Sequence, residues 1–295
     1  MALFVNTNVS SINGQRNLTN ATNNLNTTYQ RLSSGMRINS AKDDAAGLQI
    51  SDRLTSQING LNQGNRNTND AIALAQTAEG AMDEMSNMLQ RIRTLAVQST
   101  NGTNNAKDRE AIQQEVSQLS LEITRIAEQT KFGGQSFLFG GKADGSTIAN
   151  DKGIITIQVG AYNGDTLQMT GFSLGFAASV LGEGKTEDDN GFEGAEFKVS
   201  KQSTAAAAIT TADEFIAAID KQRAHLGAMQ NRMESSIRNQ SNVSMNVSDA
   251  RARIRDTDFA EESAKLSQQT IIQQAASSML TQANSRPQLA LSLLG

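Results

Sequence analysis

The chain has no cysteine, no tryptophan, one proline and one histidine among its 295 residues. Without cysteine it cannot form a disulfide, a thiolate metal site or a thiol nucleophile. The single histidine, His225, provides neither a zinc-binding cluster nor a Ser-His triad, and we expect it to be a solvated side chain. The sequence therefore does not support an enzyme, and we expect no cofactor and no metal.

Charge and long apolar runs are also scarce. The formal net charge is −4 and charged residues make up 19 % of the chain, so there is no general attraction to nucleic acid or to anionic membranes. Apolar runs stay well short of the roughly 18 residues that a membrane helix needs. Residues 1–8 carry neither the basic start nor the apolar stretch of a secretion signal. We expect no nucleic-acid partner, no membrane insertion and no cleaved signal segment.

Glycine is unevenly distributed, with 14 of the 23 glycines lying between Gly133 and Gly194. Because glycine and proline disfavour helix interiors, the glycine-poor flanks permit long helices and the middle does not. The sequence predicts a mainly α fold in which long N- and C-terminal helices enclose a smaller β region.

The two terminal segments share a coiled-coil pattern and a lack of charge. Residues 1–35 contain only Arg16 and Arg31 as charged side chains, and residues 266–295 contain only Arg286. Apolar and small residues recur there at alternating spacings of three and four, which is typical of a coiled-coil seam. We predict that the termini pair and then pack against other copies through a polymerisation core of Leu18, Leu25, Leu32, Ile272, Met279, Leu289, Leu291, Leu293 and Leu294.

The central region alternates with the period of a β-strand. Ile155 and Ile157 lie two residues apart, Asn163-Gly164 is typical of a tight turn, and Leu167 and Met169 are again two apart. This pattern predicts a β-hairpin. Residues 171–205 sustain no pattern, and we expect a short variable loop on the surface.

Several segments closely resemble the bacterial flagellins, at positions 32–50, 90–98, 157–160, 226–232 and 277–284 and at Leu293-Leu294. The resemblance implies a structural subunit of the flagellar filament, in a short form that lacks large outer domains. It implies an inner coiled-coil domain (1–43 with 255–295), a helical domain with a β-hairpin (44–170 with 206–254) and a short variable insert (171–205).

The resemblance also implies a location and partners. A flagellin is secreted through a type III export apparatus with the help of an export chaperone and becomes part of the extracellular flagellum. There it contacts copies of itself, the filament cap and the hook-associated junction proteins. Hydroxyl groups of the central region are candidates for O-glycosylation, at Ser146, Thr147, Ser173, Ser179 and Thr186.

One further surface is suggested by spacing. Arg91, Leu95 and Gln98 are four and three residues apart, so they share a helix face, and a turn at 101–105 is expected to bring Glu115 alongside them. The same four residue types stand at corresponding positions in flagellins that Toll-like receptors detect, so the resemblance implies receptor recognition. Packing between neighbouring subunits is the alternative role for this face.

Three other functions compete with the interpretation as a flagellin. A hook–filament junction protein shares the terminal helices, but the long match at both termini favours a flagellin. A chemoreceptor-like helical hairpin would have heptads throughout, which the alternation from Ile155 to Met169 contradicts. A helical enzyme lacks the clusters of catalytic side chains that it would need.

Overall fold

A computed structural model describes residues 7–138, 148–150, 153–170, 191–193 and 196–292, with side chains described as far as Ser285. By their contacts the residues divide into two units. Unit 1 comprises residues 1–58 and 245–295, and unit 2 comprises residues 59–244. Within the described part of the chain, no helix combines the length and apolar character needed to cross a membrane.

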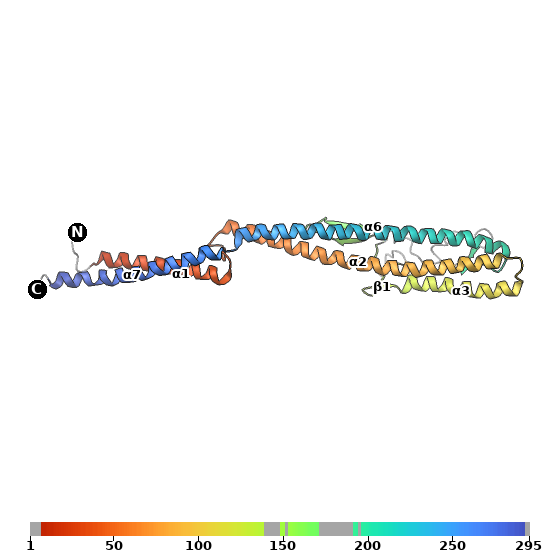
Figure 1. The fold of residues 1–295 in the computed structure, drawn as a ribbon, viewed down its shortest axis with the longest axis horizontal. Helices are drawn as coiled ribbons and strands as arrows, with labels where there is room; N and C mark the ends of the chain where they lie inside the picture. Colours follow the sequence, from red (N-terminus) through yellow and green to blue (C-terminus); the bar gives the residue numbers. More distant parts are fainter. Residues whose placement is uncertain (1–6, 139–147, 151–152, 171–190, 194–195, 293–295) are drawn as a thin grey trace. The chain divides into compact units, whose positions relative to one another are not determined.

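The fold is mainly α, as the sequence predicts (Figure 1). Three two-stranded antiparallel sheets accompany the helices, and they pair β1 with β2, β3 with β4 and β5 with β6. The helices are α1 (Val9–Ser34), α2 (Ala45–Thr100), α3 (Ala106–Gln129), α6 (Gln202–Arg255) and α7 (Phe259–Ser292). The strands are β1 (Lys131–Phe132), β2 (Gln135–Ser136), β3 (Ile155–Gln158), β4 (Thr166–Met169), β5 (Phe192–Glu193) and β6 (Glu196–Phe197).

Local sequence determines where these helices end. Helix α1 stops at Gly35, whose φ of +69° is the left-handed conformation that glycine adopts easily. Helix α3 begins with a capping box, in which the Asn105 side chain accepts from the Asp108 amide and the Asp108 side chain accepts from the Asn105 amide. The amide-rich turn before it therefore reverses the chain where the sequence predicts.

The expected domain boundary after residue 43 falls in the loop between α1 and α2. The contacts nevertheless assign the start of α2 and the end of α6 to unit 1. Ile38 explains this, because it is 1 % exposed and lies against Gly47 of α2. The neighbouring Arg37 amide donates to the Arg255 carbonyl at 2.7 Å. The loop thereby ties these helix ends together.

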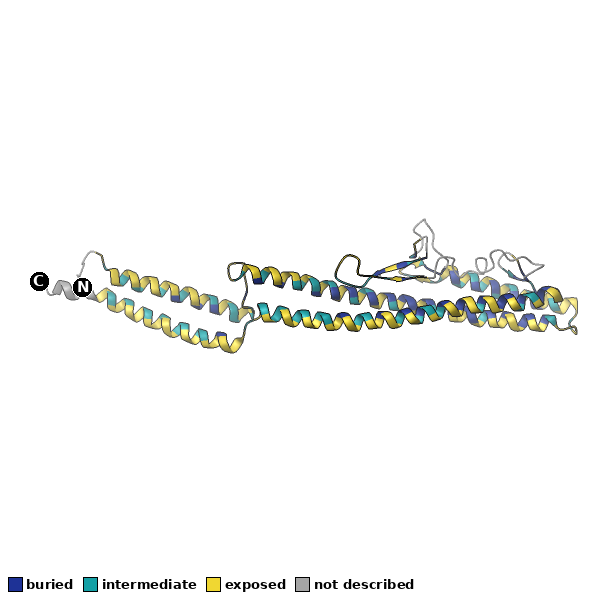
Figure 2. Ribbon diagram, turned by 90° about the horizontal axis from the view of Figure 1, so that it is seen from above, coloured by how far each residue is buried: buried dark blue, intermediate teal, exposed yellow. Residues whose placement is uncertain are grey.

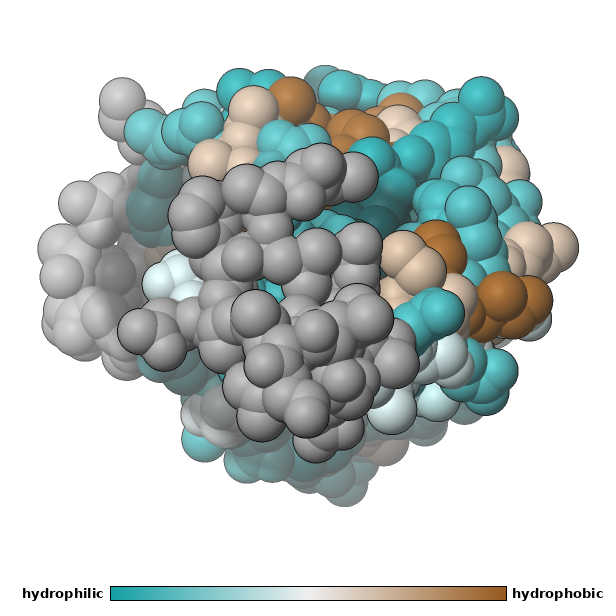
Figure 3. Space-filling view, turned by 90° about the vertical axis from the view of Figure 1, so that its left-hand side faces the viewer, coloured by the Kyte–Doolittle hydropathy of each residue, from teal (hydrophilic) through white to brown (hydrophobic). Residues whose placement is uncertain are grey.

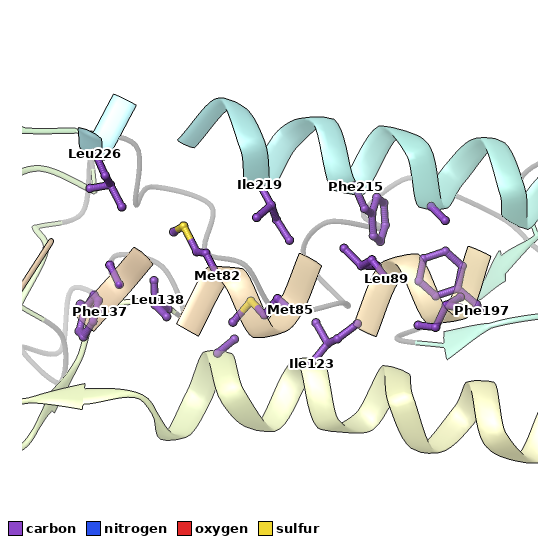
Figure 4. Packing of buried hydrophobic residues seen from close by; sticks show 14 of the residues in the cluster. Met82, Met85, Leu89, Ile123, Phe137, Leu138, Phe197, Phe215, Ile219 and Leu226 are labelled. Atoms are coloured by element: carbon purple, nitrogen blue, oxygen red, sulfur yellow. The ribbon is translucent and has the colours of Figure 1, made fainter. Parts of the chain in front are cut away.

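The hydrophobic core lies in unit 2, where α2, α3 and α6 pack along their inner faces (Figure 2). Side chains of α2 fill the space between α6 and α3 (Figure 4). Aliphatic and methionine side chains predominate, as the low aromatic content predicts. The labelled members are Met82, Met85 and Leu89 of α2, Ile123 of α3, Phe215, Ile219 and Leu226 of α6, Phe137, Leu138 and Phe197.

The segment before α6 departs from the sequence prediction. Residues 171–205 were expected to form a surface insert, but Phe192, Phe197 and Val199 are fully buried. The rings of Phe192 and Phe197 are edge-on at 4.9 Å, and both contact the ring of Phe215 in the same geometry. The prediction is wrong for residues 191–193 and 196–205, because three apolar residues without periodicity are enough to fill this part of the core. Residues 171–190 and 194–195 lie outside the described residues.

The predicted β-hairpin is confirmed as β3 and β4, with Ile157 opposite Leu167. It packs directly on the backbone of α2. A Cβ atom added to Gly64 would lie 1.9 Å from the Val159 carbonyl oxygen, which no real side chain permits. Asn67 donates its side-chain amide to the Gln158 carbonyl at 3.0 Å, one turn further along α2. Gly64 is therefore required for the contact between hairpin and helix.

Two glycines of α2 provide a direct test of this contact. Gly64→Ala should destabilise unit 2 because the hairpin must move away from the helix. Gly80→Ala should stabilise it by about 0.5–1 kcal/mol, because a Cβ added to Gly80 would enter open space and alanine favours helix. Urea unfolding of both variants gives the sign of each effect. Equal signs would contradict the proposed role of Gly64.

Candidate functional site

The terminal helices α1 and α7 pair antiparallel within unit 1, as predicted. Asn8 donates its side-chain amide to the Ala283 carbonyl at 2.7 Å near one end of the pair. Further along, Gln273 Nε2 donates to Thr22 Oγ1 at 3.4 Å. Residue numbers therefore fall on α7 as they rise on α1, so the first helix of the chain is aligned along the last.

The predicted seam of α1 is confirmed. Leu25 is buried and Leu18 and Leu32 are partly buried, and the other members of the heptad pattern are also shielded from solvent. The side of α1 that faces α7 is formed by residues at alternating spacings of four and three. They are Gly14, Leu18, Ala21, Leu25, Thr28 and Leu32.

The stripe of α7 that faces α1 is not the one that carries Ile272 and Met279, whose role in the polymerisation core stays a prediction. Ile272 and Met279 are 41 % and 67 % exposed and do not form the contact with α1. The residues shielded there follow the same spacing but include glutamines: Glu262, Leu266, Gln269, Gln273, Ala276, Leu280 and Ala283. The chain instead pairs through the more polar stripe and leaves the apolar one exposed.

A groove with a volume of about 1070 Å³ runs along the pair beside this seam. Its α1 wall includes a row of amides formed by Asn13, Asn17, Asn20 and Asn24. The middle of its α7 wall is apolar, with Ile272, Ala275 and Met279, and polar residues such as Gln269 and Gln282 lie at its ends. From the end at which the termini lie, hydrophobic residues form separate patches on a largely hydrophilic surface (Figure 3). The groove suits an amphipathic occupant with one apolar side and one hydrogen-bonding side.

The remaining predicted members of the polymerisation core cannot be placed. Leu289 and Leu291 lie within the bounds of α7, but their side chains are outside the described residues, as are Leu293 and Leu294 altogether. The candidate glycosylation positions also lie outside the described residues. They are Ser146, Thr147, Ser173, Ser179 and Thr186.

The second candidate surface is only partly as predicted. Arg91 on α2 forms an ion pair with Glu115 on α3, with Nη2 2.7 Å and Nε 2.9 Å from the same carboxylate oxygen. Gln98 is exposed. Leu95, however, is 3 % exposed and belongs to the core cluster of unit 2. The prediction that it lies on the surface with the other three is wrong, because the helix rotates it inward beside Ala96.

His225 also differs from its prediction. It lies partly buried on α6, and its Nδ1 is shielded from solvent without a hydrogen-bond partner in the described structure. Among the described residues, no group of three or more His, Asp or Glu side chains could hold a metal ion.

Two family models match the chain. The bacterial flagellin N-terminal helical region matches residues 5–143, and the bacterial flagellin C-terminal helical region matches residues 209–294. Flagellin B of Vibrio cholerae is 39 % identical and flagellin A of the same organism 38 %, each covering all of both chains. These alignments run over 376 and 378 positions against the 295 residues here, so the relatives contain insertions.

Solved structures show a similar arrangement of helices. A putative flagellar hook-associated protein from Vibrio parahaemolyticus has a TM-score of 0.55 and 15 % identity, covering 72 % of this chain and all of that chain. At that identity it shows the fold alone. A Bacillus cereus flagellin is 33 % identical with a TM-score of 0.48, covering 59 % of this chain and 88 % of that one.

The burial of Leu95 makes a prediction about stability. Leu95→Ala should lower the free energy of unfolding by about 2–5 kcal/mol, because it leaves a cavity in the core. Arg91→Ala should cost less than about 1 kcal/mol, since an exposed ion pair contributes little. Urea unfolding measured on both variants, with Gln98→Ala as a neutral control, separates the two roles. If Leu95→Ala and Arg91→Ala had equal free energies of unfolding, Leu95 would contribute no more to the core than an exposed residue does.

Proposed function

Because this chain belongs to the bacterial flagellin family, we propose that its terminal helices α1 and α7 carry the contacts between copies through their groove and its apolar wall. The chain is a structural subunit that polymerises into the flagellar filament, and it is not an enzyme. The residues that line this groove are the ones proposed to contact the next copy in the filament. The observation that carries it is the outward-facing apolar stripe of α7.

The distribution of apolar residues supports this assignment. Unit 1 contains few buried hydrophobic residues, namely Ala21, Leu25, Ile38 and Ile58. It carries most of the large hydrophobic side chains that the described structure exposes: Val9, Ile12, Tyr29, Ile50, Met245, Phe259, Ile271, Ile272 and Met279. Apolar surface concentrated in this way is typical of an interaction site, and a second copy of the chain would cover it.

A helix of another copy is the occupant that the groove fits best. Its apolar side would lie against Ile272 and Met279, and its polar side would exchange hydrogen bonds with the asparagine row of α1. The apolar residues near the C-terminus, Leu289, Leu291, Leu293 and Leu294, are proposed to take part in the same contact between copies. A nearly uncharged surface suits this packing because no like charges must be brought together.

The hook–filament junction protein is the weaker alternative. Similarity to flagellins at 38–39 % identity extends over the whole chain. The hook-associated structure shares the fold alone, at 15 % identity. No observation favours the junction role.

The remaining partners are proposed from family membership. They are the export chaperone, the type III export apparatus that would secrete the chain, the filament cap and the hook-associated junction proteins. A Toll-like receptor is a further candidate, for which Arg91, Gln98 and Glu115 offer exposed polar side chains while Leu95 supports them from beneath. If this face also packs between subunits of the filament, a receptor could reach it only on the unassembled monomer.

A charge in the groove should block polymerisation. Met279→Lys should raise the critical concentration for filament assembly by about 10- to 150-fold, because burying a methionine contributes roughly 1.5–3 kcal/mol and an unpaired ammonium cannot replace it. Met279→Leu keeps the apolar volume and should assemble normally. Sedimentation and electron microscopy measure both, and unfolding of unit 2 should be unchanged. Filaments of Met279→Lys at the unmodified chain's critical concentration would refute the groove assignment.

A further inference from the structure

One carboxylate is almost completely buried in the terminal helix pair. Glu262, near the start of α7, is 4 % exposed. Arg31, near the end of α1, lies opposite it with Nη1 3.7 Å from Glu262 Oε1. Among the described residues, this is the one ion pair that joins α1 to α7. The Arg31 side chain is 27 % exposed, so Glu262 is the buried member of the pair. A buried carboxylate between two paired helices calls for an explanation.

Stability alone does not explain the pair. Glu262 Oε1 and Arg31 Nε are both shielded from solvent and without a hydrogen-bond partner in the described structure. Lys265 approaches the other carboxylate oxygen from within α7, at 3.5 Å. Buried ion pairs contribute little net stability when their geometry is incomplete, whereas removing one partner is strongly destabilising. Their best supported role in paired helices is to specify alignment.

The contacts that specify alignment lie toward the two ends of the pair. At the end away from Glu262, Leu280 packs against Gly14 and Asn8 donates to the Ala283 carbonyl. In the middle of the seam Gln269 and Gln273 repeat one turn apart, so a slide of α7 by one turn exchanges one glutamine for the other. The same slide moves Glu262 about 5.4 Å along the axis. It would separate the carboxylate from Arg31 and leave Lys265, on the same helix, as its remaining cation.

We infer that Arg31 and Glu262 set the register of α1 against α7. The inference deepens the proposed function, since the register decides which α7 residues stand opposite the asparagine row and so the shape of the groove offered to the next copy. The pair acts as a specificity determinant of helix alignment, and the neighbouring apolar residues supply the adhesion.

Charge reversal tests the pairing. Arg31→Glu and Glu262→Arg should each raise the critical concentration for assembly by at least about tenfold, because each buries two like charges together. The double reversal restores opposite charges and should assemble far better than either single variant. Reversing the exposed pair of Arg125 and Glu122 on α3 is the matched control and should have no effect. Single reversals that assemble like the unmodified chain would overturn the inference.

An apolar replacement separates register from stability. Arg31→Met with Glu262→Leu removes the charges but keeps the volume, so the helices should still pair, now in mixed registers. Because the chain has no cysteine, a disulfide trap reads the register directly. Thr22→Cys with Gln273→Cys reports the native alignment, and Thr22→Cys with Gln269→Cys reports a one-turn slide.

The expected result is native cross-linking alone with Arg31 and Glu262 present, and both cross-links in the apolar double variant. Native cross-linking alone in both backgrounds would show that other residues set the register. The trap is applied to the full chain and does not need filaments. If the unmodified chain fails to polymerise, the proposed function fails, while the cross-links still decide the register.

Discussion

The terminal helices leave much of their apolar surface exposed when they pair with each other, and the rest of the molecule contrasts with them in this respect. Unit 2 has a continuous core of aliphatic and methionine side chains. Unit 1 instead pairs its helices through a seam that contains Thr28, Gln269 and Gln273 and leaves Ile272 and Met279 to solvent. A more apolar seam would stabilise the isolated chain but would use the residues that a neighbour needs. The stability of the pair and its capacity to assemble therefore compete for the same side chains.

Much of the fold follows from the sequence because its signals are local. The Asn163-Gly164 turn, the β-alternation around it and the spacing of Leu18, Leu25 and Leu32 each depend on nearby residues only, and each is confirmed. The register of α7 could not be obtained in this way. Periodicity reveals that a helix has an apolar stripe, but it does not reveal whether that stripe faces its own chain or another one.

The candidate site residues likewise include some that local sequence places correctly and some that it does not. The contact between Arg91 and Glu115 was expected because a helix face and a single turn determine it. The position of Leu95 was predicted incorrectly because residues three and four apart lie only approximately on the same face of a helix. The side of α2 that carries Leu95 is turned toward α3 and α6, so the leucine lies inside. Phe192 and Phe197 were missed since a core can recruit isolated rings that belong to no repeat. A short aromatic pair beside a turn would have been the signal to follow.

The glycine contact between α2 and the β-hairpin has a mechanical consequence. At Gly64 no side chain separates the helix from the Val159 carbonyl, so backbone rests directly on backbone. Closely packed interiors have low compressibility and transmit strain. A bend of α2 at Gly64 therefore also displaces β3, and the helix and the hairpin move together.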